Sequence, residues 1–164
     1  MTERPSPMLL GQLAFMREFL PEHLERLAEL AEHVRWEADE TIFRAGSHGA
    51  VLYVVREGRV AIEFSTAGRK RMTILTVGPG DVFGWSGVFA NRPKAVSARA
   101  VLATEAYAFD AAGLRALCDA DPRFGYAFTR RLLSAVSERL KETRMQLMDL
   151  FANPAPRAPR GEHI

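Results

Sequence analysis

Hydrophobic residues near the start of the chain recur three and four positions apart, which is the spacing of one helical face. Leu24, Leu27 and Leu30 follow this spacing, with charged residues between them. Pro21 precedes them, and proline is well suited to the first position of a helix. We therefore expect an amphipathic helix that starts at Pro21, after a shorter helix from about Leu9 to Phe19.

The hydrophobic period changes to two over the stretch from about His33 to Asp110, where short alternating runs are separated by turns. Val60, Ile62 and Phe64 show this alternation directly after a Glu-Gly turn. Short strands at this spacing, with glycine-containing turns, are typical of a jelly roll or barrel. The pattern predicts a mainly β domain with flanking helices, and the interior of such a roll can hold one small ligand.

Two more helices are expected after the strands. Asp110 is a suitable N-cap for a helix from Ala111 to about Cys118. Asp121 and Pro122 have the residue types that start a helix, and this last and longest helix is expected to reach about Phe151. Cys118 lies at helical spacing from apolar residues, so we expect it in the core and not as a reactive thiol.

A heptad-like pattern runs along the longest helix at alternating steps of three and four: Tyr126, Thr129, Leu133, Val136, Leu140, Thr143, Leu147 and Leu150. Such a seam is typical of paired helices. It could pack on its own domain, but it continues long after the strands end, which favours a homodimer. The predicted dimer interface comprises Leu133, Val136, Leu140, Thr143, Leu147 and Leu150.

The composition is that of one globular domain with a core: 164 residues, 48% hydrophobic and 26% charged. A net charge of +2 is too small to indicate nucleic-acid binding by itself. The single cysteine allows no intrachain disulfide, which suits a reducing cytoplasm. The sequence contains neither an apolar run long enough for a membrane span nor a signal-peptide pattern. A cytoplasmic location without a membrane partner is therefore expected.

No arrangement of residues typical of an enzyme is found. The histidines are His23, His33, His48 and His163, and they form no His-x-His motif and no pair at helical ligand spacing. This weakens the interpretation of the roll as a metal-binding cupin. Ser86 has no base at a recognisable spacing, which argues against a serine nucleophile. We expect a non-enzymatic protein without a metal.

The stretch from Phe83 to Gly87 combines two glycines with a hydroxyl group, and Lys94 and Ser97 follow it. Glycine lets a ligand approach the backbone amides closely. Exposed amides, a cation and a hydroxyl are what a phosphate site needs. The alternative is a two-glycine loop before an edge strand, with cations that are simply solvated.

This stretch resembles the phosphate-binding cassette of cyclic-nucleotide-binding domains. The family pattern is Phe-Gly-Glu, seven variable residues, Pro, and Arg-Ala-Ala-Thr, and it aligns here without a gap. The matching residues are Phe83, Gly84, Pro93 and Ala95. The departures are Trp85 for the Glu, Lys94 for the Arg, Val96 for the second Ala and Ser97 for the Thr. The resemblance covers roughly residues 20 to 150 and implies the family's jelly-roll fold.

The resemblance also implies a pocket between the roll and the cassette. Its implied ligand-binding residues are Phe83, Gly84, Trp85, Ser86, Gly87, Lys94, Ala95 and Ser97. In the family the Glu accepts a hydrogen bond from the ribose 2′-hydroxyl, whereas the indole of Trp85 can only donate one. Cyclic AMP and cyclic GMP are therefore expected to bind poorly. The expected ligand is an anionic, nucleotide-like molecule with an apolar part against Trp85.

The chain is expected to have a disordered N-terminus (1–8), a cyclic-nucleotide-binding-like domain (9–120), a dimerisation helix (121–151) and a disordered tail (152–164). Regulators of the catabolite-activator type follow this domain with a helix-turn-helix, for which about a dozen residues after the long helix are too few. DNA binding is therefore not expected. The basic loop 68–71 is expected at a hairpin tip.

The favoured function is a stand-alone sensor or regulatory module, in which the long helix reports ligand binding or joins two copies. The alternative is a protein-interaction or scaffold domain that kept the fold, lost the ligand and binds an unknown protein partner. The replacement at Trp85 is the feature that supports this alternative. A cupin-like enzyme is the third, least favoured interpretation.

Overall fold

The computed structural model describes residues 4–65, 70–90 and 92–152. The helices in this part of the chain are α1 (Pro7–Gly11), η1 (Ala14–Met16), α2 (Pro21–Leu30), η2 (Trp85–Gly87), α3 (Ala111–Ala120) and α4 (Pro122–Ala152), of which η1 and η2 are single 3₁₀ turns. The strands are β1 (Ala31–Trp36), β2 (Thr41–Phe43), β3 (Val51–Glu57), β4 (Val60–Ser65), β5 (Arg71–Val77), β6 (Val82–Phe83), β7 (Ser97–Ala100) and β8 (Thr104–Asp110).

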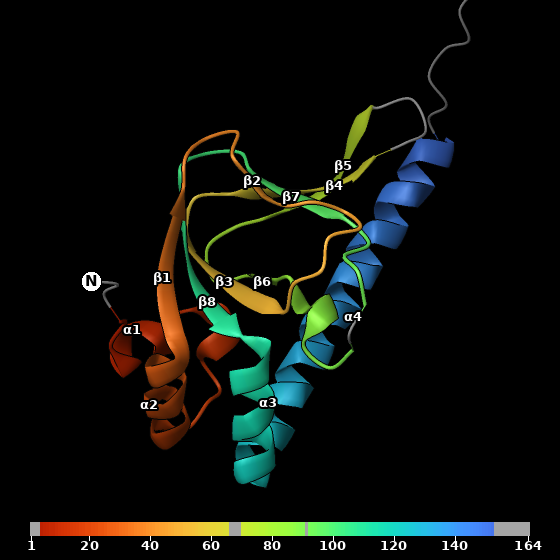
Figure 1. Cartoon of the computed structure of the whole chain (residues 1–164). Coiled ribbons are helices and arrows are strands. Elements are labelled where there is room, and N and C mark those ends of the chain that lie inside the picture. The colour runs from red at the N-terminus through yellow and green to blue at the C-terminus, as the bar shows by residue number, and fades with distance from the viewer. Residues whose placement is uncertain (1–3, 66–69, 91, 153–164) are drawn as a thin grey trace, which may run out of the picture.

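The strands form two four-stranded sheets, ordered β1-β8-β3-β6 and β2-β7-β4-β5, and every strand pair in them is antiparallel. The two sheets enclose the roll that fills the upper half of the molecule in Figure 1. Their inner faces meet in a small core of Val55, Val60, Val77, Phe83 and Ala98. The predicted mainly β fold with flanking helices is therefore confirmed.

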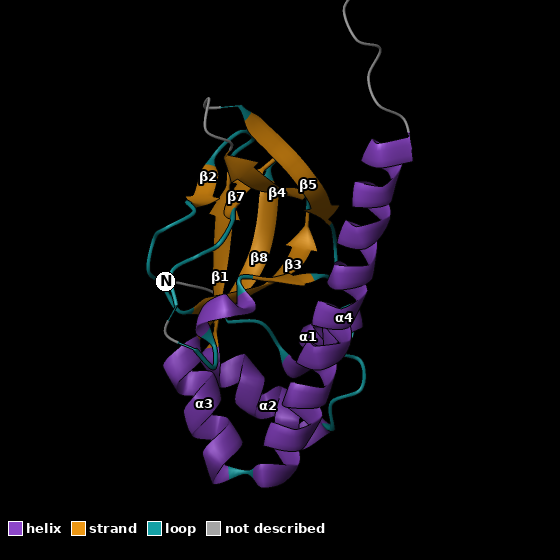
Figure 2. Ribbon diagram, turned by 90° about the vertical axis from the view of Figure 1, so that its right-hand side faces the viewer, coloured by secondary structure: helices purple, strands orange, loops and turns teal. Residues whose placement is uncertain are grey.

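The helices gather at one end of the roll, and α4 extends from that end past both sheets (Figure 2). A larger apolar core lies between these helices and β1, β3 and β8. Its largest fully buried side chains are Leu10, Met16, Leu27, Leu52, Phe109, Leu114, Phe124 and Phe128. The first part of α4 thus belongs to the domain core.

The predicted helix from Leu9 to Phe19 is wrong in its bounds, because the chain forms α1 and η1 separately. Ser6 caps α1 by accepting a hydrogen bond from the Leu9 amide at 3.3 Å, so the helix starts at Pro7. The amide of Phe15 donates to the Gly80 carbonyl at 3.2 Å, outside any helical pattern. The contact with the roll therefore interrupts the helix that propensity alone would continue.

The two aspartate caps predicted after the strands are confirmed. Asp110 accepts from the Gly113 amide at 3.1 Å, and Asp121 accepts from the Phe124 amide at 3.2 Å. Cys118 is half-buried beside the larger core, and burial raises the pKa of its thiol. A raised pKa disfavours the reactive thiolate, which agrees with the expected core role.

The side chains of the long helix α4 differ in how far the rest of the domain buries them. Leu132 is 6% exposed in the core, whereas its neighbour Leu133 is 64% exposed and Leu140 is 49% exposed. The residues that pack on the domain, such as Leu132, are not members of the predicted seam, whose residues are exposed or half-buried in the single chain. Pairing of the seam with a second copy stays a prediction. Residues 68 and 69 of the basic loop and the tail 153–164 lie outside the described residues. No helix in the described ranges is long and apolar enough to cross a membrane.

Leu132→Ala should lower the free energy of unfolding by about 2–5 kcal/mol, because it leaves a cavity between α4 and the core. Leu102→Ala is the matched control, since Leu102 is 54% exposed, and its cost should stay within about 0.5 kcal/mol. Urea unfolding at low protein concentration measures both values. Equal costs for the two variants would show that α4 does not pack on the domain as described.

Candidate ligand-binding site

The loop that follows β6 requires glycine at its first position. Gly84 has φ of +81°, and a Cβ there would lie 2.7 Å from the Val51 carbonyl oxygen. The chain then makes one 3₁₀ turn, η2, which carries Trp85 and Ser86. The turn predicted from the two glycines is therefore present.

The end of the 3₁₀ turn is held by its backbone, at Gly87 and Val88. A Cβ on Gly87 would lie 2.7 Å from the Gly49 carbonyl oxygen, so the two chain segments pass at van der Waals distance. Arg115 of α3 donates hydrogen bonds to the carbonyls of Val88 and Gly87, at 2.7 and 3.4 Å. Sequence reasoning missed Arg115, because the carbonyls that it contacts are 27 and 28 residues away in the chain.

Phe83 holds the start of the loop inside the roll. Its ring is fully buried and stacks on Tyr53 at a centroid distance of 5.0 Å and on Phe43 at 6.2 Å. Aromatic pairs at these separations stabilise a fixed geometry beyond their burial. Phe83 therefore positions the loop and also forms part of the wall of the roll.

Lys94 is the buried cation of the site. Its side chain reaches into the roll, is 6% exposed, and donates a hydrogen bond from Nζ to the Gly84 carbonyl at 3.2 Å. The same Nζ lies 4.7 Å from the centre of the Phe43 ring, within cation–π range. Among the described residues no carboxylate forms an ion pair with Lys94, and burial lowers its pKa.

A cavity of about 310 Å³ lies between the roll, the loop and α4. The residues that line it are Phe43, Ile62, Phe64, Ile74, Leu75, Val77, Phe83, Gly84, Trp85, Ser86, Lys94, Ala95, Val96, Arg139 and Thr143. Most are apolar, two are cationic, and no carboxylate of the described chain is among them. Trp85 is half-buried and also packs against the larger core, so its indole lies between the cavity and the helices.

The structure brings together six of the eight predicted ligand residues around this cavity. Gly87 does not line it, and Ser97 lies on β7 with its hydroxyl accepting a hydrogen bond from the Ala45 amide at 2.9 Å. Because residues alternate along a strand, the neighbour Ala98 faces the interior and is fully buried. We therefore withdraw Ser97 from the ligand set implied by the resemblance.

The long helix contributes side chains that sequence reasoning did not assign to the cavity. Thr143, predicted for the dimer seam, is half-buried and lines the cavity, while its hydroxyl donates to the Arg139 carbonyl at 2.8 Å. Arg139 lines the same cavity from one turn earlier. Arg139 lies on the helical face that continues from Phe128 and Leu132, and this spacing could have indicated its position. The heptad pattern lies on a neighbouring face and does not include Arg139.

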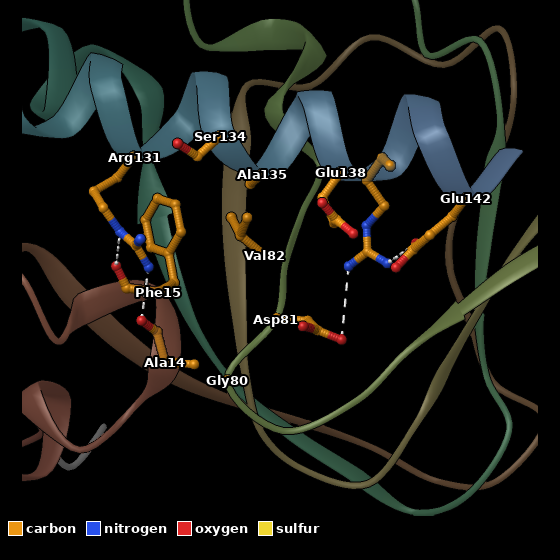
Figure 3. A pocket seen from close by; sticks show the side chains of 11 residues that line it. Ala14, Phe15, Gly80, Asp81, Val82, Arg131, Ser134, Ala135, Glu138 and Glu142 are labelled. Carbon is orange, nitrogen blue, oxygen red and sulfur yellow. Dashed lines mark hydrogen bonds and ion pairs between the residues drawn. The ribbon is translucent and has the colours of Figure 1, made fainter. Parts of the chain in front are cut away.

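A second hollow of about 320 Å³ lies on the face of α4 that meets η1 and the turn before β6 (Figure 3). Arg131 donates to the carbonyls of Ala14 and Phe15, at 2.8 and 3.1 Å. The Asp81 carboxylate points from the turn toward α4 in Figure 3 and forms an ion pair with Arg139 at 3.6 Å. Two arginines two turns apart therefore join α4 to the rest of the domain.

The described residues contain no group of three His, Cys, Asp or Glu side chains that could hold a metal ion. The side chains around the cavity offer a buried ammonium, a guanidinium, hydroxyl groups and a large apolar surface. A buried charge without a carboxylate partner is costly, so this arrangement favours an anionic ligand as the missing counter-charge.

Lys94→Met should change how the stability depends on pH. The folded-state pKa of Lys94 lies below its ordinary value of 10.5, so the unfolded chain binds the proton more tightly. The free energy of unfolding of the wild type should therefore rise, relative to Lys94→Met, as the pH increases from the folded-state pKa toward 10.5. Denaturant titrations across this range, with the surface substitution Lys141→Met for comparison, measure the difference; a difference that falls with pH contradicts the burial.

Comparisons with known proteins identify the family and the fold. The family model described as "Cyclic nucleotide-binding domain" matches residues 33–121, which is more than half of the chain. A "CRP-like cAMP-activated global transcriptional regulator" of Mycobacterium tuberculosis is 24% identical over 90% of this chain. This chain spans 64% of the length of that relative.

Solved structures show the same fold. A cyclic nucleotide-binding domain from Methylobacillus flagellatus superposes with a TM-score of 0.77 at 19% identity, over 92% of this chain and 84% of that one. A catabolite activator protein from Thermus thermophilus gives a TM-score of 0.69 at 25% identity, over 90% of this chain and 63% of that one. These similar proteins are regulators and binding domains, and their fold confirms the predicted jelly roll. The chain belongs to the cyclic nucleotide-binding domain family.

Proposed function

We propose that this protein is a non-enzymatic sensor or regulatory module that binds a small anionic ligand in the cavity between the roll, the loop after β6 and α4. The observation that carries the proposal is Lys94, a residue that is 6% exposed in a mostly apolar cavity. Among the residues that the structure describes, the partners of its ammonium group are the Gly84 carbonyl and the Phe43 ring. An anion bound there would supply the counter-charge that these partners do not.

The rest of the cavity favours a ligand with an apolar part. Ile62, Leu75 and Val77 line one side of it, and Trp85 lines the side toward the helices. Burying an apolar group against such surfaces contributes about 25 cal/mol per Å². The ligand class is therefore an anion joined to an aromatic or aliphatic group.

Cyclic AMP fits this cavity poorly. A ribose 2′-hydroxyl needs an acceptor, and at the position of the family's Glu this chain has Trp85, whose indole can only donate. An unpaired hydroxyl costs about 1–3 kcal/mol, or about 5- to 150-fold in affinity. Lys94 can neutralise a phosphate only as a point charge, because an ammonium group cannot form the bidentate hydrogen bonds of an arginine. A relative from Mycobacterium tuberculosis carries the name of a cAMP-activated regulator. On this proposal the ligand of the present chain is a different anion.

The exposed face of α4 supports a homodimer. Leu133, Leu140 and Leu147 are 64%, 49% and 55% exposed and follow one another at steps of seven residues. A second copy would bury this face as a coiled-coil seam. In this arrangement α4 both lines the cavity and joins the two protomers.

The expectations that the protein is not an enzyme and does not bind DNA stay predictions.

The anion-binding proposal is tested by calorimetric titration with 2-naphthoate, 2-naphthol and cyclic AMP. The naphthoate carries an anion on an apolar ring system, and the naphthol is its neutral counterpart. We expect the naphthoate to bind and the other two to bind much more weakly. Lys94→Gln should lower naphthoate affinity by about 10- to 150-fold, because a charged hydrogen bond is worth about 1.5–3 kcal/mol.

A second comparison tests the account of Trp85. The double substitution Trp85→Glu with Lys94→Arg should raise the affinity for cyclic AMP, because it restores the acceptor and the two-pronged cation. Binding of cyclic AMP by the wild type at low micromolar concentration or tighter would overturn this account. If neither naphthoate nor cyclic AMP binds, the ligand-free interaction domain becomes the better interpretation.

The dimer is tested by sedimentation. Leu140→Glu should convert dimers into monomers, because it places an unpaired charge in the buried seam. Met145→Glu is the matched control, since Met145 is 59% exposed on another face of α4 and should leave the dimer intact. A wild type that is monomeric at tens of micromolar, or a control that dissociates equally, contradicts pairing through this seam.

A further inference from the structure

Arg139 lies in the wall that separates the ligand cavity from the hollow in Figure 3, because it lines both. Its side chain is 14% exposed. It is the second cation of the ligand cavity, and it comes from α4, whereas Lys94 comes from the loop region. The two cations of the site therefore belong to the two elements that enclose the cavity.

Among the residues that the structure describes, the contacts of Arg139 leave part of its guanidinium without a hydrogen-bond partner. One terminal nitrogen donates to the Glu142 carboxylate at 3.1 Å, and the other forms an ion pair with Asp81 at 3.6 Å, which is too long for a hydrogen bond. The Nε–H group takes part in neither contact. A guanidinium has five donors, so Arg139 can accommodate a further anion.

Asp81 connects Arg139 to the loop that follows β6, which we call the ligand loop. Its carboxylate accepts from the Gly78 amide at 2.9 Å, and its carbonyl accepts from the Val55 amide at 2.9 Å, so the turn before β6 is well fixed. Only the two residues of β6 separate Asp81 from Gly84, whose carbonyl accepts from Lys94. The Asp81–Arg139 pair therefore joins α4 to the same short strand that carries the ligand loop.

We propose that Arg139 is a second anion-binding group of the cavity, and that Asp81 and the ligand compete for it. A ligand anion held by Lys94 would draw the guanidinium away from Asp81 and so weaken the contact between α4 and the turn before β6. This inference rests on the proposed function and adds to it the residue pair through which binding acts on α4. Because coupling is reciprocal, weakening the Asp81 contact must also strengthen ligand binding.

A purely structural role for the pair makes a different prediction. Asp81 is 47% exposed, and partly exposed ion pairs contribute about 0.2–1 kcal/mol. If the pair only stabilises the fold, its loss should lower the stability and leave the affinity unchanged. If Asp81 competes with the ligand, its loss should raise the affinity by up to about 5-fold. The direction of the change in affinity separates the two roles.

The test is a titration of 2-naphthoate into the full chain carrying Asp81→Asn. The asparagine oxygen can still accept from the Gly78 amide, so the turn keeps its hydrogen bond. Glu138→Gln is the matched control: Glu138 lines the same hollow and loses the same charge, but pairs with Lys141 and not with Arg139. We expect about 1.5- to 5-fold tighter binding for Asp81→Asn and no more than about 1.5-fold change for Glu138→Gln.

A third variant shows whether the effect acts through Arg139. Arg139→Gln should weaken naphthoate binding, and the gain from Asp81→Asn should disappear in the double variant. Arg139→Lys keeps the charge and should retain part of the affinity. In the wild type, naphthoate should speed amide exchange in the turn at residues 78–81, as expected if Asp81 loses its partner.

Equal effects of Asp81→Asn and Glu138→Gln, or weaker binding by Asp81→Asn, overturn the competition and leave anion binding by Lys94 intact. Persistence of the Asp81→Asn gain in the Arg139→Gln background overturns it as well. If the wild type binds no naphthoate and Lys94→Gln changes nothing, the proposed function fails, and this inference fails with it.

Discussion

The hydrogen bond from the Lys94 ammonium to the Gly84 carbonyl is the interaction on which the site depends. It crosses the loop from one end to the other, over residues 84–94, and it places a positive charge beside the Phe43 ring inside the roll. Gly84 can take its backbone conformation only because it lacks a Cβ, and Phe83 holds it in place by stacking. A charge held this way is costly unless a ligand anion offsets it, which is why the account of function centres on this residue.

The long helix has two consequences for such a ligand. Its first part is core, with Phe124 and Phe128 fully buried, and its middle part lines the cavity through Arg139 and Thr143. The same middle part exposes Leu140 to solvent in the single chain. Arg139 of the cavity wall is the direct neighbour of Leu140 in the sequence, and Thr143 belongs both to the wall and to the face proposed to join a second copy. Binding and assembly would therefore share one rigid element.

The sequence was sufficient to predict the fold, because the change of hydrophobic period from helical to two is a local signal and the glycine turns mark its ends. The loop after β6 could be recognised because its glycines and the Phe83-Gly84 pair are also local signals in the sequence. Ser97 was misplaced because its direction depends on which face of β7 turns inward, and the pattern of small residues around it does not decide this. Arg115 was missed because its contacts are made by a segment far away in the chain. Arg139 was missed because the heptad pattern marks a neighbouring face of α4.

The central claim is that an anion binds at Lys94, and a crystal structure with 6-bromo-2-naphthoate tests it most directly. The anomalous signal of bromine locates the ring, and the density locates the carboxylate. The account predicts bromine within the cavity lined by Trp85 and a carboxylate oxygen at about 2.7–3.2 Å from Lys94 Nζ. A ligand bound elsewhere, or one in the cavity with its carboxylate turned away from Lys94, would contradict it.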